Sequence, residues 1–197
     1  MEGKEHLSVE GLNKIVSIKS CMNGNGLSDK LKKEFPALPI MTRPIWEVSS
    51  LGEKAIYDPC WLAGFIDAEG CFFVHIRKSA GYKVGYQVSL IFQVSQDMKD
   101  KELLQILVKF FGCGKVWASN KKIGAFKVES VKDILTKVIP LLESAPLLGT
   151  KAKDYDDFKQ VAFLIKEKAH TTQEGLDKII KIKGGMNRAR AREGDKD

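Results

Sequence analysis

Residues 62–70 read LAGFIDAEG, a short apolar segment that ends in an acid and a glycine. It lies in an apolar run over residues 60–69 that follows Pro59, a residue suited to the first turn of a helix. Gly64 and Ala68 stand four residues apart, so they share one face of the predicted helix. Glycine inside a helix costs roughly 1 kcal/mol relative to alanine. Its presence therefore predicts close backbone approach to another helix.

Glu69 stands at the end of this predicted helix, and Gly70 is expected at the C′ position that closes it. An anion at a helix C-terminus is disfavoured by roughly 0.3–1 kcal/mol, because that end carries partial negative charge. A carboxylate held there against local preference could ligate a divalent cation together with a phosphate, the usual arrangement for Mg²⁺. Such a cation would activate water for phosphodiester cleavage. Asp67 is expected to point to another side and only to cap or bridge.

The rest of the chain predicts an α+β domain of order α-β-β-α-β-β-α-α-α. Its four strands come as two hairpins, so the sheet should be antiparallel, with helices packed on one face. The expected strands are 71–78, 86–96, 115–119 and 125–129, with the second hairpin turning at 120–124. The expected helices are 60–69, 100–111, 131–142 and 154–168, followed by one more from Thr172.

Polar and basic side chains recur at every second position of these strands and mark the face that the helices leave open. A solvent-exposed, basic sheet face suits the binding of nucleic acid. The residues of this alternating set are His75, Arg77, Gln87, Ser89, Gln93, Lys115, Trp117, Ser119, Lys127 and Glu129.

An internal repeat gives the organisation of the chain. Residues 4–23 (KEHLSVEGLNKIVSIKSCMN) and 168–187 (KAHTTQEGLDKIIKIKGGMN) are identical at 11 of 20 aligned positions. Each copy predicts a short helix with Ser8 or Thr172 near its N-cap. The second copy closes the predicted domain, so the first is expected to be the last helix of a preceding repeat. We therefore predict a terminal helix and linker over 1–44, a domain over 45–190 and a flexible tail over 191–197.

Composition excludes several classes of protein. The formal charge of +7 suits a polyanionic partner. No apolar run approaches the ~20 residues that span a bilayer, and the N-terminus has no secretory h-region. The four cysteines are widely spaced, without a CxxC pair, so neither a disulfide framework nor a zinc site is indicated. A reducing compartment fits best.

The sequence resembles the LAGLIDADG homing endonucleases. LAGFIDAEG matches the naming motif at seven of nine positions, and both differences are conservative. YQVSLIFQVSQ (86–96), FFGCGKV (110–116) and PLLGTK (146–151) are also similar to that family. The resemblance covers about residues 4–190 and is strongest to organellar intron-encoded members, which makes a mitochondrial location an expectation from the family alone.

The resemblance implies a fold of the αββαββα type with a saddle-shaped sheet on double-stranded DNA, and it implies roles for individual residues. Glu69 and Gly70 would hold Mg²⁺ or another divalent cation, Gln96 would orient water, and Lys151 would be the basic residue near the scissile phosphate. Base contacts would come from the alternating set, chiefly Arg77, Gln87, Ser89, Gln93, Trp117 and Lys127. Lys78, Lys83 and Lys122 would contact phosphates, and Cys71, Phe73 and Ile91 would complete the DNA face. The helix that packs on a second repeat would do so through Trp61, Leu62, Gly64, Phe65 and Ala68.

The sequence departs from two-motif members in carrying a single motif, which supplies one carboxylate and half a saddle. Three arrangements stay open: a homodimer, a half that pairs with a separately made repeat, and a relic that only binds. The function expected is Mg²⁺-dependent, site-specific DNA cleavage. The alternative is a non-catalytic RNA-binding protein, such as an intron maturase or a part of an organellar ribosome, since a basic saddle also suits structured RNA. A pure protein-interaction module leaves Glu69 and the basic face unexplained.

Overall fold

The computed structural model describes residues 4–22, 26–38, 58–118 and 122–187. The chain divides into two compact units, Met1–Ser50 and Leu51–Asp197, and each is described by itself. The predicted domain boundary between residues 44 and 45 and the predicted tail over 191–197 lie outside the described residues.

The first unit contains η1 (Glu5–Leu7), α1 (Val9–Cys21) and α2 (Asp29–Glu34). The predicted N-cap of α1 is present, because the Ser8 hydroxyl accepts the backbone N–H of Gly11 at 3.0 Å. The second copy of the repeat begins in the same way, with the Thr172 hydroxyl accepting the N–H of Gly175 at 3.1 Å. The two copies therefore share local structure as well as sequence.

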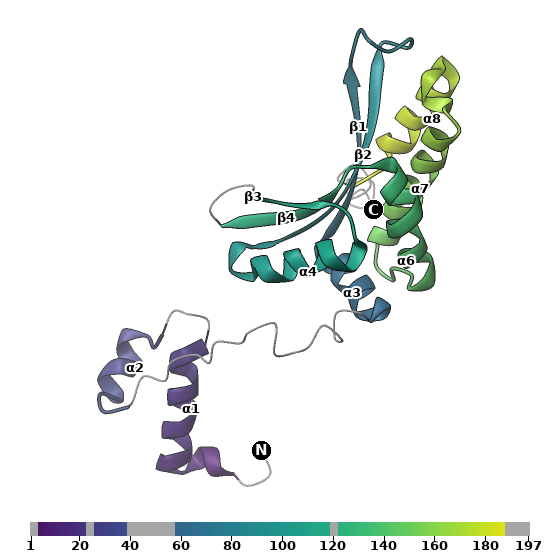
Figure 1. Cartoon of the computed structure of the whole chain (residues 1–197). Helices are drawn as coiled ribbons and strands as arrows, with labels where there is room; N and C mark the ends of the chain where they lie inside the picture. The colour runs from purple at the N-terminus through teal and green to yellow at the C-terminus, as the bar shows by residue number, and fades with distance from the viewer. Residues whose placement is uncertain (1–3, 23–25, 39–57, 119–121, 188–197) are drawn as a thin grey trace, which may run out of the picture. The chain divides into compact units, whose positions relative to one another are not determined.

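The second unit has the predicted order of elements (Figure 1). Its sheet comprises β1 (Gly70–Lys78), β2 (Tyr86–Asp97), β3 (Lys115–Ala118) and β4 (Ile123–Val128). Its helices are α3 (Pro59–Glu69), η5 (Met98–Asp100), α4 (Lys101–Phe111), α5 (Val131–Asp133), η6 (Ile134–Val138), α6 (Ile139–Ser144), α7 (Lys151–Lys166), η7 (Ala169–Thr171) and α8 (Gln173–Gly184). No helix within the described ranges is long and apolar enough to cross a membrane.

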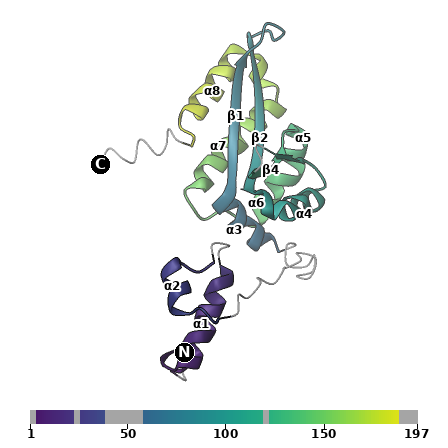
Figure 2. The same cartoon turned by 90° about the vertical axis from the view of Figure 1, so that its left-hand side faces the viewer.

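The sheet is antiparallel throughout, with strand order β1-β2-β4-β3. Helices α3, α4 and α7 pack against its strands, and Figure 2 shows β1 and β2 lying in front of α7 and α8. One face of the sheet is therefore covered by helices and the other is open. The predicted α+β class and antiparallel four-stranded sheet are confirmed.

The core lies between the sheet and its helices. Phe72, Phe92, Phe126 and Phe158 are fully buried. The rings of Phe72 and Phe92 stack with their centroids 5.5 Å apart, and Phe158 lies 5.3 Å from Phe72. Such aromatic pairs add about 0.5–1.5 kcal/mol beyond area burial. This core fixes the strands that carry the open face.

Several predicted boundaries are wrong in detail. The helix expected over 131–142 is interrupted by the π-helical turn η6, just before Pro140. Proline has no N–H to donate within a helix, so a wider turn accommodates it. The helix expected to begin at Asp154 begins at Lys151 instead. Strand β4 covers residues 123–128, which leaves Glu129 just beyond it, and Ser119 lies outside the described residues.

The two repeated helices differ in what they bury. Leu176 and Ile179 of α8 are 1% and 0% exposed, because α8 packs on α7. The equivalent Leu12 and Ile15 of α1 are 42% and 44% exposed. At these two positions the repeat is core in α8 and exposed in α1, whereas at the next position the burial is reversed, with Val16 4% and Ile180 46% exposed.

Candidate active site and nucleic-acid face

Helix α3 passes directly into β1, so Glu69 ends the helix and Gly70 begins the strand. The Glu69 side chain is exposed. Gly70 is not in the left-handed conformation expected of a C′ glycine, since its φ is −74°. It is required for space instead, because a Cβ on Gly70 would lie 2.5 Å from the carbonyl oxygen of Ile66. The close approach of helix and strand holds the carboxylate at the edge of the sheet.

Lys151 lies against this junction. Its Nζ donates to the carbonyl oxygens of Ala68 at 3.0 Å and Ile66 at 3.4 Å. These carbonyls belong to the last turn of α3, where a cation is favoured by the helix dipole. Lys151 therefore offsets the unfavourable position of Glu69 and brings a cation close to the carboxylate-bearing turn. The sequence did not predict this contact, because it joins residues more than 80 positions apart.

Asp67 binds the segment that leads into α7. Its Oδ2 accepts the backbone N–H of Leu148 at 3.2 Å and that of Gly149 at 2.7 Å. The bridging role expected for Asp67 is thus confirmed. The partner segment was not predictable from local pattern, since it follows a helix 80 residues downstream.

Asn187 ties the end of α8 to the start of β1. Its backbone N–H donates to Asp154 Oδ1 at 2.9 Å, and its Nδ2 donates to the Phe72 carbonyl at 3.1 Å. The Cys71 thiol lies 3.8 Å from its Oδ1. Partial burial raises the pKa of the Cys71 thiol, which the nearby Lys151 partly counteracts. Sequence reasoning missed Asn187, although both copies of the repeat end on asparagine.

Gln96 lies near the end of β2, opposite Gly124 of β4. Its Oε1 accepts the backbone N–H of Asp97 at 3.0 Å. This contact folds the side chain back onto its own strand. A role in orienting water stays a prediction.

The open face of the sheet gathers most of the predicted DNA-contacting residues. Register pairs Arg77 with Gln87, His75 with Ser89, Phe73 with Ile91 and Cys71 with Gln93. It further pairs Gln93 with Lys127 and Lys127 with Lys115. Trp117 is 52% exposed, unusual for so large an apolar side chain. These residues share one face because side chains at paired positions point the same way.

This face is electropositive. Partial burial lowers the pKa of His75, and the positive charges of Arg77, Lys183 and Lys127 lower it further, against the opposing effect of Glu129. Lys183 comes from α8 and was not among the predicted residues. Lys78 at the end of β1, Lys83 in the turn that follows it and Lys122 before β4 are all exposed.

The outer face of α3 is open in the described part of the chain. Gly64 is exposed, and a Cβ added there would meet nothing within 4 Å. Trp61 stacks on Phe65 with ring centroids 5.4 Å apart and is 42% exposed. Leu62 was predicted to pack on a second repeat, but it is 0% exposed and belongs to the domain's own core. The remaining predicted interface residues form a surface of two stacked aromatic side chains, Trp61 and Phe65, beside the exposed small residues Gly64 and Ala68.

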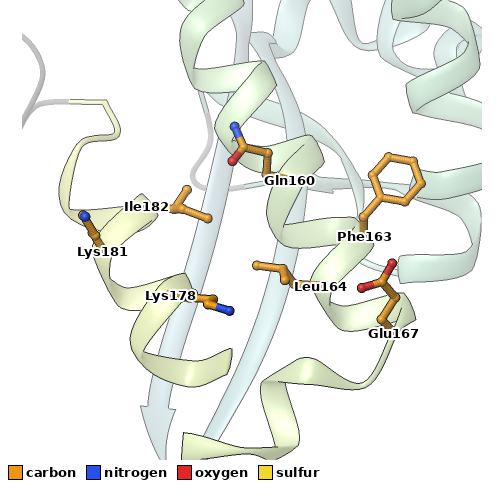
Figure 3. Close-up of a pocket in the computed structure, with 7 residues that line it drawn as sticks. All are labelled: Gln160, Phe163, Leu164, Glu167, Lys178, Lys181 and Ile182. Atoms are coloured by element: carbon orange, nitrogen blue, oxygen red, sulfur yellow. The ribbon is translucent and has the colours of Figure 1, made fainter. Parts of the chain in front are cut away.

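A separate hollow of about 460 Å³ lies between α7 and α8 (Figure 3). It is lined by Gln160, Phe163, Leu164, Glu167, Lys178, Lys181 and Ile182. None of the predicted catalytic or DNA-contacting residues is among them. The candidate site is therefore the α3–β1 junction and the open sheet face, rather than this hollow.

Residues 62–162, just over half of the chain, match the model of the LAGLIDADG endonuclease family. The chain belongs to this family. The match begins at the first residue of LAGFIDAEG and extends through most of α7. The LAGLIDADG motif is thus the helix that carries Glu69 to the edge of the sheet.

Two solved LAGLIDADG structures resemble nearly the whole chain. The homing endonuclease I-LtrWI bound to its target DNA is 43% identical with a TM-score of 0.84, over 95% of this chain and 61% of that one. I-SmaMI bound to cleaved DNA is 39% identical with a TM-score of 0.87, over 96% of this chain and 62% of that one. A probable intron-encoded endonuclease of Neurospora crassa is 36% identical over 93% of this chain.

The chain spans only part of these LAGLIDADG relatives, 34% of the Neurospora protein and about three fifths of the two solved chains. Both solved relatives are described with DNA. The RNA-binding alternative finds no support among these three proteins.

The LAGLIDADG junction offers ligands of the right chemical type for a divalent cation, because the Glu69 carboxylate and the Gly70 carbonyl are hard oxygen ligands. Two ligands are too few to complete the coordination of such a cation. The described residues contain no group of three or more His, Cys, Asp or Glu side chains that could hold a metal. A cation bound at Glu69 would need further ligands from phosphate, from water or from a second LAGLIDADG motif.

Proposed function

We propose that this chain is one catalytic half of a site-specific DNA endonuclease that cleaves double-stranded DNA with a divalent cation. The observation that carries the proposal is the exposed Glu69 at the end of α3, braced by Lys151 and adjoining the open basic face of the sheet. An exposed carboxylate on a helix end that a lysine binds through its backbone carbonyls, next to a surface for a polyanion, suits phosphodiester hydrolysis.

Each residue has a defined part in this proposal. Glu69 and the Gly70 carbonyl would hold Mg²⁺ or another divalent cation, which supplies charge stabilisation and an activated water when bound. Gln96 would orient the water. Lys151, already at the α3 terminus, would stabilise charge developing on the scissile phosphate.

The open face would read and hold the DNA. Arg77, Gln87 and Gln93 have the side chains that hydrogen-bond guanine and adenine edges in the major groove. Lys78, Lys83 and Lys122 are exposed around the hairpins and would contact phosphates, which position the protein without reading sequence. Lys183 would join them, since its charge acts on His75 of this face.

The partner proposed is a second LAGLIDADG repeat, supplied by a second copy or by another polypeptide segment. The open surface at Gly64 and Ala68 on α3 supports it, because a glycine there costs stability without a close neighbour. The exposed Leu12 and Ile15 of α1 support it independently, since their equivalents in α8 are core. The third arrangement is a lone repeat that binds DNA without cleaving it.

We propose a mitochondrial location for the protein. Its support is that relatives are named as intron-encoded endonucleases, and one is named for an intron of ND4 in Podospora anserina.

The test begins with selection of duplexes that the protein binds from a random double-stranded library, followed by addition of Mg²⁺. We expect strand cleavage in the selected duplexes, and Glu69→Gln should abolish it while changing DNA affinity less than about twofold. Light scattering on the bound species would establish whether the cleaving form is a dimer.

Two results would overturn the proposal. Full-rate cleavage by Glu69→Gln removes the carboxylate from the mechanism. Failure to enrich any duplex, when a parallel selection from a random RNA library does enrich RNA, removes DNA as the substrate.

A further inference from the structure

Two reciprocal contacts join α3 to the start of α7. A carboxylate on α3, Asp67, accepts two N–H groups just before α7, and a cation on α7, Lys151, donates to two carbonyls at the end of α3. Each charge thus faces the helix end whose partial charge is opposite to its own. Thr150, the N-cap residue of α7, makes no side-chain capping hydrogen bond, so Asp67 supplies the anion there.

The fit around Asp67 is tight. A Cβ on Gly149 would lie 2.8 Å from Asp67 Oδ1 and 3.0 Å from Oδ2. Glycine at 149 is therefore required by the carboxylate rather than by backbone conformation, since no positive φ is found there. Only Thr150 separates Gly149 from Lys151, so fixing Gly149 limits where the Lys151 ammonium group can lie.

We propose that Asp67 is a positioning residue for the reaction: by holding Leu148 and Gly149 it fixes Lys151 relative to Glu69, two residues further along the same helix. The inference rests on the proposed endonuclease function for its kinetic consequence, but its structural consequence is measurable without cleavage. A misplacement of about 1 Å at a reacting centre can cost on the order of 100-fold in rate.

The structural experiment measures the rate at which acetic anhydride acetylates Lys151, by peptide mass spectrometry. Lys153, exposed and two residues away, is the internal reference. In Asp67→Ala the ratio of Lys151 to Lys153 modification should rise at least threefold, because Lys151 leaves the Ala68 and Ile66 carbonyls. Asp67→Asn keeps an oxygen acceptor and should stay within about twofold of the starting protein. An unchanged ratio in Asp67→Ala overturns the inference.

The kinetic experiment uses single-turnover cleavage of a selected duplex at saturating protein. Asp67→Ala should slow cleavage about 10–100-fold while DNA affinity changes less than about twofold, and Asp67→Asn should recover most of the rate. Asp100→Ala is the matched control, since Asp100 is exposed and makes no side-chain cap hydrogen bond. Parallel loss of affinity and rate, without rescue by asparagine, would mean general unfolding and would overturn the positioning role.

Gly149→Ala adds an independent check. Alone it should slow cleavage as Asp67→Ala does, because its methyl group displaces the carboxylate. Combined with Asp67→Ala it should add little, because the group it collides with is gone. Additive losses would contradict the contact as the cause. If the starting protein cleaves nothing, the proposed function fails for the homodimer, while the acetylation ratio still decides whether Asp67 positions Lys151.

Discussion

The ammonium nitrogen of Lys151 lies 3.0 Å from the carbonyl oxygen of Ala68, the residue before Glu69. A helix end that carries an acid is thereby neutralised by a lysine from an element 80 residues away. The carboxylate can stay exposed without an uncompensated negative end behind it. Stability and the proposed chemistry consequently depend on the same side chain.

Lys151→Met should therefore destabilise the unbound protein as well as suppress cleavage. We expect a loss of about 1 kcal/mol in the free energy of unfolding, from the lost hydrogen bonds and dipole interaction. Urea denaturation measures it. Lys153→Met is the control, because Lys153 is exposed and should change stability by less than about 0.5 kcal/mol. Equal stability of the two variants would show that the contact contributes nothing.

The parts of the molecule that follow from local pattern were predictable from sequence. The period-two alternation of β1 and β2 gives the open face, and the small residues of LAGFIDAEG give the exposed side of α3. Leu62 was misassigned because helix periodicity does not say which of two apolar faces meets the domain's own core. The contacts of Asp67, Lys151 and Asn187 join distant segments, so a single sequence contains no local signal for their partners.

Gly64→Ala should stabilise the isolated chain and weaken its association with a second repeat. In the isolated chain the added methyl group meets nothing within 4 Å, and the gain in helix propensity should raise stability by up to about 1 kcal/mol. Association with a second repeat should weaken, because the methyl group separates the helices. Urea denaturation at low concentration and light scattering on DNA measure the two effects. Unchanged assembly would remove Gly64 from the interface.

His75 should make DNA binding depend on pH. Burial and the neighbouring cations lower its pKa in the unbound protein, and bound phosphates should raise it. The complex then takes up a proton, so affinity should increase as pH falls through the His75 pKa of the complex toward that of the unbound protein. His75→Gln should flatten this dependence between about pH 5 and 7.5, and His170→Gln, on η7, should not. Salt should be held constant, because phosphate contacts are strongly salt-dependent.

The lowered pKa of His75 also makes folding stability depend on pH. DNA affinity should increase as pH falls, whereas folding stability should decrease. A histidine whose folded-state pKa is lowered binds fewer protons when folded than when unfolded. The contribution of neutral His75 to folding stability is therefore fully present above its unfolded-state pKa of about 6.5 and is lost as pH falls below that pKa. Replacing His75 with glutamine should make stability less dependent on pH in this window. A variant whose stability falls with pH as steeply as that of the starting protein would contradict the lowered pKa of His75.

Asn187 allows backbone and side-chain effects to be separated. Its φ of 54° lies in the left-handed region, which asparagine and glycine tolerate better than alanine. Asn187→Ala should lower the free energy of unfolding by about 2 kcal/mol, because alanine is strained at this φ and the hydrogen bond from Nδ2 to the Phe72 carbonyl is lost. Asn187→Gly should lose about half as much, since only the side-chain bond is missing. Urea denaturation ranks the two variants, and a glycine variant no more stable than the alanine variant would show that the backbone conformation at 187 carries no cost.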